Sequence, residues 1–333
     1  SGMTAEGVYF MIGTFQNCYS LKEIDLSNMT SCRNLEWPTW MFQNCYKLQK
    51  VTLSPTFTAG GRLKQPYQMF ENCASLKELD LTGLQILNTT SPNNHAGNAN
   101  TVNMTSMFNG CTSLEVLEIS TWNMPTANGQ FACVKGMFGN CTSLRTIYVG
   151  NGWSAARITN NASNAANAAL ADAPTMFVGC MKIKGADGTT YRSDIASTTS
   201  PGNSTYAKIG GGGYLSAKDY VIPGSYAMWT LDGAGDLMVE PIDGGAGNLA
   251  GFVEADNGNA IPWYACRGNI FTFHIENGTL SIASGNSLAN MFRDCTKLTT
   301  CDLAGLDTAN AQSFYKMFFN CKALESLDVS GFT

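Results

Sequence analysis

Residues 107–120 read Met107-Phe108-Asn109-Gly110-Cys111-Thr112-Ser113-Leu114-Glu115-Val116-Leu117-Glu118-Ile119-Ser120, and close copies of this stretch recur along the chain. One such unit cannot bury its own apolar face, so the copies must stack on one another to form a core. The alternating apolar residues after the cysteine are typical of a short strand with one buried face. We therefore predict an α/β solenoid with short parallel strands and an irregular or helical convex side.

The copies divide the 333 residues into four predicted parts. Residues 1–195 form a first repeat array, in which the marker cysteines are 27 to 39 residues apart, so insertions enter between units. Residues 196–222 are rich in Gly and Ser and indicate an array end or linker. Residues 223–284 contain hairpin patterns around Asp232-Gly233 and predict a β-rich cap. Residues 285–333 resume the repeat, and we expect this second array to continue or stack beyond the chain end.

The chain has twelve cysteines, a number that can indicate the disulfides of a secreted protein. Eight of them share one repeat position, where cysteine serves as a small buried hydrophobe. Stacked strands are close enough for bridges, but side chains that point the same way favour free thiols. No C-x-x-C spacing occurs, so we expect no metal site. The redox state stays open for the four others, Cys32, Cys133, Cys266 and Cys301.

Composition narrows the classes of function. The net charge of −5 disfavours non-specific nucleic-acid binding, which needs clustered Lys and Arg. The chain has no run of 18 or more apolar residues, so the sequence predicts no membrane-spanning helix. Only 14% of residues are charged, and this polar, weakly charged surface favours an extracellular, cell-surface or secreted protein.

The residues between the buried positions of each strand point outward and predict a binding surface. Extended faces of this kind are what stacked repeats offer to macromolecules, and their carboxylates favour a basic partner or a bound cation. For any single residue, a solvated strand face without a function is the alternative. The first row is Glu23, Lys50, Glu78, Val116 and Thr146. The second row is Asp25, Thr52, Asp80, Glu118 and Tyr148, with Asp302 and Asp328 in the equivalent places of the second array.

The sequence supports an enzymatic function less well than a binding function. Paired carboxylates can hydrolyse glycosides, but an open strand face lacks the enclosed pocket that raises the pKa of an acid. A cysteine nucleophile needs a histidine partner, and the chain has only His95 and His274. The phenylalanines at fixed register indicate core packing rather than ligand stacking. We therefore predict no enzyme, no catalytic residue and no cofactor.

The repeats resemble the BspA-like branch of the leucine-rich repeats, found in surface proteins of gut and oral bacteria and of some protists. The resemblance rests on Met69–Thr82, Asp302–Thr308, Met176–Cys180, Asp187–Tyr191 and the pair Trp229–Gly233 with Pro262–Tyr264. The chain departs from the family pattern in its irregular spacing and at Thr14, where a methionine precedes the phenylalanine elsewhere. The resemblance implies cell-surface display, adhesion and protein binding, without a shared catalytic site. We expect a protein or glycan partner at a surface. Head-to-tail self-association in a surface array is the alternative.

Overall fold

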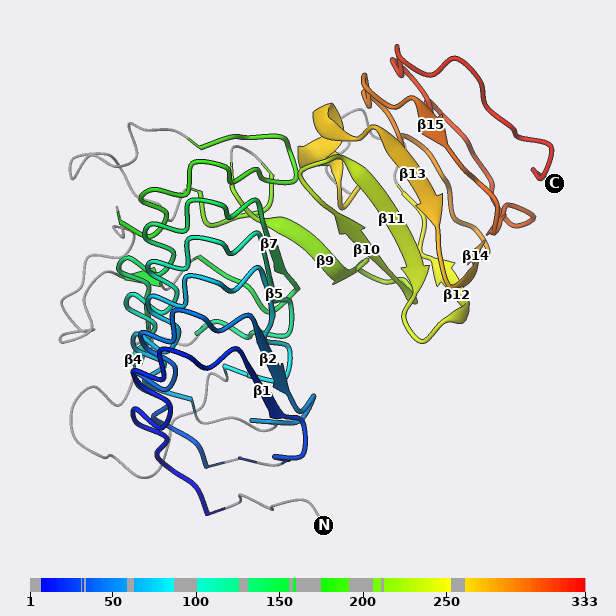
Figure 1. Ribbon diagram of the computed structural model, residues 1–333. Helices are drawn as coiled ribbons and strands as arrows, with labels where there is room; N and C mark the ends of the chain where they lie inside the picture. Colours follow the sequence, from blue (N-terminus) through cyan, green and yellow to red (C-terminus); the bar gives the residue numbers. More distant parts are fainter. Residues whose placement is uncertain are drawn as a thin grey trace. The chain divides into compact units, whose positions relative to one another are not determined.

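The computed structural model describes residues 7–30, 32, 34–58, 63–86, 101–125, 131–155, 158–159, 175–191, 206–210, 213–252 and 261–332. The chain divides into two compact units (Figure 1). Unit 1 comprises residues 1–183 and 190–208, and unit 2 comprises residues 184–189 and 209–333. The finer boundaries predicted from the sequence stay predictions, as does self-association. Among the described residues, no helix is long and apolar enough to cross a membrane.

Unit 1 is a stack of repeats, and the first five have a short strand after the cysteine (Figure 1). These strands pair in parallel, as predicted, while the described segments before the cysteines are turns rather than helices. A second parallel sheet lies ahead of the Met-Phe pairs. The first group is β1 (Glu23–Leu26), β2 (Lys50–Leu53), β3 (Glu78–Asp80), β5 (Val116–Ile119) and β7 (Thr146–Val149). The second sheet is β4 (Thr101–Asn103), β6 (Phe131–Cys133) and β8 (Ile158–Thr159).

Backbone hydrogen bonds and stacked rings join the turn segments of successive repeats. The N–H of Phe15 donates to the carbonyl of Met41 at 2.8 Å. In the same way, the backbone N–H groups of four further phenylalanines donate to the methionine carbonyl of the next repeat: Phe42, Phe70, Phe108 and Phe138. The rings of these phenylalanines and Phe177 stack with centroids 5.2 to 5.8 Å apart. All but the first are fully buried, which confirms the predicted core role.

The repeat cysteines are free thiols, and those of unit 1 form a column. All twelve cysteines of the chain are unbridged. Of the eight at the repeat position, six are buried, while Cys18 is exposed and Cys321 is half-buried. The expected burial of Cys18 is wrong because no earlier repeat covers it among the described residues. Burial raises the pKa of Cys45 to about 11, so this thiol keeps its proton at neutral pH.

Six of the eight repeat thiols use their proton in a hydrogen bond to the preceding repeat. The Sγ–H donates to the carbonyl of the phenylalanine in the preceding repeat, with Sγ–O distances of 2.9 to 3.2 Å. Cysteine suits the position because it is small, apolar and still a weak donor. The donors are Cys45, Cys73, Cys111, Cys141, Cys180 and Cys321.

Unit 2 combines an antiparallel start with parallel stacking. β9 (Ser216–Val221), β10 (Ala227–Leu231) and β11 (Asp236–Pro241) pair antiparallel, which confirms the predicted hairpin at Asp232-Gly233. β11 then pairs in parallel with β13 (Thr272–Ile275), and β13 with β15 (Thr300–Cys301). The core between the sheets includes Trp229, Trp263, Phe273 and Phe292, with the 3-10 helix η3 (Tyr264–Asn269) alongside. A second parallel sheet consists of β12 (Gly245–Leu249), β14 (Gly278–Ile282) and β16 (Leu306–Asp307).

Two details of unit 2 differ from the sequence prediction. β9 lies inside residues 196–222, so the end of that segment is a strand rather than an array end or linker. β13 and β14 stack in parallel with the strands of the following repeat, so parallel stacking begins before residue 285. The sequence does not reveal this parallel pairing, because a strand with alternating burial can pair in either direction. The strand beside it determines whether the pairing is parallel or antiparallel.

Candidate binding surface on the repeat strands

The strand face of unit 1 carries the ten residues predicted there, in two rows. On β1 and β2, Glu23 lies opposite Lys50 and Asp25 lies opposite Thr52. These two strands form a sheet of their own, separate from the sheet that contains β3, β5 and β7. In the sheet that contains β3, β5 and β7, the first row consists of Glu78, Val116 and Thr146. The second row there consists of Asp80, Glu118 and Tyr148. The predicted face is therefore present but divided between two sheets.

Exposure separates these residues into three groups. Five charged side chains are exposed, and four others are half-buried. Glu118 is the exception, because only 7% of it is exposed. Its Oε1 accepts the backbone N–H of Ser120 at 3.1 Å, so the side chain turns back onto its own strand end. The expectation that Glu118 faces a partner is therefore wrong. The exposed residues are Glu23, Asp25, Lys50, Glu78 and Asp80.

The aspartates of the second row also stabilise the turns that follow their strands, a role that the sequence analysis did not predict. The Oδ1 of Asp25 accepts the backbone N–H of Ser27 at 2.8 Å. Asp80 accepts both the N–H and the hydroxyl of Thr82, at 2.8 and 2.7 Å. An Asp two residues ahead of Ser or Thr in a turn is the sequence signal that could have revealed this role. In unit 2, Asp302 and Asp328 make the same bond to residues 304 and 330.

The turn bonds fix the direction of the carboxylates, and at two of them they also lower the pKa. Hydrogen bonds from the side chain and then the backbone of Ser27 lower the pKa of Asp25. Ser330 lowers the pKa of Asp328 in the same way. The acceptor bonds favour the ionised form because a carboxylate is a better acceptor than a neutral acid. Asp25 and Asp328 are therefore anions held in one orientation at the surface.

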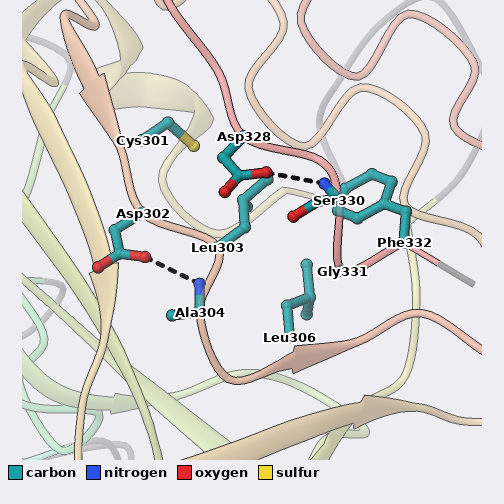
Figure 2. A pocket seen from close by; sticks show the side chains of 9 residues that line it. All are labelled: Cys301, Asp302, Leu303, Ala304, Leu306, Asp328, Ser330, Gly331 and Phe332. Carbon is teal, nitrogen blue, oxygen red and sulfur yellow. Dashed lines mark hydrogen bonds between the residues drawn. The ribbon is translucent and has the colours of Figure 1, made fainter.

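Two open hollows lie at matching places, where the strand of one repeat ends against the turn of the next. The first, of about 140 Å³ in unit 1, contains Thr52 and Asp80. Beside it, a Cβ on Gly83 would lie 2.1 Å from the carbonyl oxygen of Ser54, so only glycine allows this approach. The second hollow, of about 260 Å³ in unit 2, brings Asp302 and Asp328 together (Figure 2). Its other lining residues are Cys301, Leu303, Ala304, Leu306, Ser330, Gly331 and Phe332.

Comparison with known proteins identifies the repeats of unit 1. Residues 9–163 match the BspA type leucine rich repeat region, in six copies. These repeats are BspA-type leucine-rich repeats. Residues 270–332 match a family described as a Mycoplasma protein of unknown function.

Other comparisons add little to the BspA-type match. No curated protein matches the chain. A crystal structure of a leucine-rich repeat protein from Bacteroides ovatus ATCC 8483 is 16% identical, with 96% of this chain and 69% of that chain covered. Its TM-score is 0.26, and at that value the likeness carries no argument.

Outside the BspA-type repeats, unit 2 holds a histidine between two carboxylates. The Nδ1 of His274 lies 3.3 Å from Asp236, and its Nε2 lies 3.2 Å from Glu276. The three side chains lie on a strand face, partly exposed, rather than in a closed pocket. No group of three His, Cys, Asp or Glu side chains in the described ranges is arranged to hold a metal ion. His95 falls outside those ranges.

Proposed function

We propose that the BspA-type repeats bind a protein partner through their strand face, outside the cell. The observation that carries this proposal is the row arrangement of five exposed charged side chains on paired strands. Parallel pairing fixes the backbone beneath them, and the turn bonds fix Asp25 and Asp80 in one orientation. A surface that is ordered before contact loses little conformational entropy when a partner binds.

The charges of this surface favour a partner with lysine and arginine side chains. Four of the five exposed residues are carboxylates, and Lys50 is the only cation among them. Complementary charges speed encounter and exclude wrongly charged partners more than they raise affinity. Because these groups are exposed, their contribution weakens as salt concentration rises. We propose binding and no reaction, since the carboxylates lie on an open surface rather than in an enclosed pocket.

The test is a variant that removes charge and keeps shape. It combines Glu23→Gln, Asp25→Asn, Glu78→Gln and Asp80→Asn, so the turn acceptors at positions 25 and 80 remain. Binding is measured by biolayer interferometry against immobilised collagen, laminin and other extracellular-matrix proteins, at low and high salt. We expect salt-sensitive binding to at least one protein and an affinity about tenfold lower for the variant, at an unchanged unfolding midpoint. Equal binding by the variant, or no binding to any protein of the panel, contradicts the proposal.

The proposed location is tested separately. Intact cells that express the native gene are treated with a protease that does not enter them, and the repeats are followed with an antibody. Loss of the antibody signal from intact cells is expected. A signal lost only after the cells are broken contradicts surface display.

A further inference from the structure

The turn segments ahead of the cysteines carry a tryptophan at a strained backbone position. Trp40 has a φ of 57°, in the left-handed region that bulky residues rarely adopt. The same repeat position has a φ between 51° and 61° in six other repeats, where it is glycine twice and otherwise a polar residue: Gly13, Gln68, Ser106, Gly136, Asn290 and Lys316. The fold therefore accepts glycine there. Trp40 is the one bulky aromatic residue among these seven positions, so the backbone does not require an indole there, and this points to a use for the side chain beyond the fold.

Contacts to the next repeat hold this indole in place. Its Nε1–H donates to the Oε1 of Gln68 at 2.8 Å. Its ring meets Tyr67 edge-on, with centroids 6.1 Å apart and an interplanar angle of 62°. Trp40, Tyr67 and Gln68 are all half-buried, so each presents part of its side chain at the surface. The result is an aromatic corner with an amide beside it.

A chain of amides continues from this corner and joins four repeats. The Nε2 of Gln16 donates to the Oε1 of Gln43 at 2.5 Å. Gln43 and Gln68 both donate to the Oε2 of Glu71, at 2.6 and 2.5 Å. Asn109 donates to the other oxygen of the same carboxylate at 3.1 Å. Every amide has a second N–H, so the chain offers donors along the stacking direction.

We propose that this amide–aromatic surface, made of Trp40, Gln43, Tyr67, Gln68 and Glu71, binds a neutral polysaccharide. A sugar ring presents C–H groups that pack on aromatic rings, and hydroxyls that bond to amides and carboxylates. Glu71 carries the one formal charge of the set, and three amides already donate to it, so the surface does not select a charged polymer. Successive repeats are 5.2 to 5.8 Å apart at their rings, close to the length of one sugar unit along a chain.

The test is affinity electrophoresis of the full chain in native gels. The gels contain hydroxyethylcellulose, xylan or galactomannan as neutral probes, and alginate as a charged probe. We expect at least one neutral polysaccharide to retard the protein, and alginate not to retard it. The variant Trp40→Gly replaces the indole with the residue found at positions 13 and 136. We expect its affinity to fall about tenfold, as for the loss of an aromatic anchor.

Two further variants keep the test decisive. Tyr67→Thr substitutes the residue found at the equivalent positions 39 and 105, and is expected to weaken binding even if Trp40→Gly does not fold. Tyr46→Thr is the matched control, because Tyr46 is an exposed ring stacked on Tyr19 and threonine stands at positions 112 and 142. No retardation, retardation by alginate alone, or equal retardation of wild type and both surface variants overturns the proposal.

The polysaccharide surface goes beyond the strand-face proposal, since it uses other residues and another class of ligand. The strand-face variant with four substitutions is expected to be retarded like the wild type. Trp40→Gly is expected to bind matrix protein like the wild type. Either proposal can therefore fail while the other stands.

Discussion

The thiol of Cys111 donates a hydrogen bond to the carbonyl oxygen of Phe70, 3.1 Å away in the preceding repeat. That carbonyl also accepts the backbone N–H of Cys73 at 3.1 Å. One oxygen thus closes a turn within its own repeat and receives a side chain from the next. The cysteine column therefore stabilises the stack without any covalent bridge.

Replacing Cys111 with alanine should destabilise unit 1 measurably. The change removes a buried sulfur and its hydrogen bond, and we expect a loss of about 2 kcal/mol in the free energy of unfolding. Urea titrations followed by circular dichroism measure the loss. Cys18→Ala is the control, because Cys18 is exposed and should change the midpoint very little. Equal effects at the two positions contradict the role assigned to the column.

The pH dependence of stability should report the buried thiols. Burial raises the pKa of Cys45 from 9.0 to about 11. Below pH 9 the thiol is protonated in the folded and the unfolded chain alike. Between pH 9 and about 11 the unfolded chain loses this proton and the folded chain keeps it, so stability falls as pH rises. Wild type should therefore exceed Cys45→Ala in urea midpoint by less at about pH 10.5 than at about pH 8. A constant difference contradicts the assignment.

The turn role of Asp80 predicts a difference between two substitutions. Asp80→Ala removes the acceptor of both bonds from Thr82 and should cost about 1 kcal/mol. Asp80→Asn keeps an Oδ1 acceptor and should cost clearly less. Glu78→Gln, on the same strand and exposed, is the control and should have little effect. Thermal unfolding ranks the three variants, and the turn role is rejected if Asp80→Asn costs as much as Asp80→Ala.

Glu71 should be sensitive to loss of its charge alone. Gln43, Gln68 and Asn109 all donate to its carboxylate. In Glu71→Gln these three donors would face a neutral amide, which has one acceptor oxygen in place of two and an NH2 group that cannot accept. We expect a cost of about 2 kcal/mol, in the range of hydrogen bonds to charged groups. Hydrogen exchange of the turn at residues 40–45 should become faster. Glu23→Gln, on the exposed strand face, should leave that exchange unchanged. Slow exchange in the Glu71 variant would falsify this role.

The register of the repeats was enough to predict the buried phenylalanines and most of the buried cysteines. It also placed the parallel strands, because each of these features depends only on a residue's position in its own unit. The burial of Glu118 was not predictable in this way, since it depends on how a longer acid reaches its own turn. The donors around Glu71 come from two other repeats and a neighbouring turn, so no single copy of the pattern reveals them. Side-chain hydrogen bonds between repeats are what the pattern leaves undetermined.

The bond from each phenylalanine N–H to the methionine carbonyl of the next repeat runs one way along unit 1. Every repeat in this ladder thus has a donor edge and an acceptor edge, and any donor edge fits any acceptor edge. Excision of residues 107–136 would bring the N–H of Phe70 opposite the carbonyl of Met137, which replaces the carbonyl of Met107 with the same kind of acceptor. The array is therefore modular, and its gene can gain or lose whole units by duplication or deletion without a new interface having to evolve.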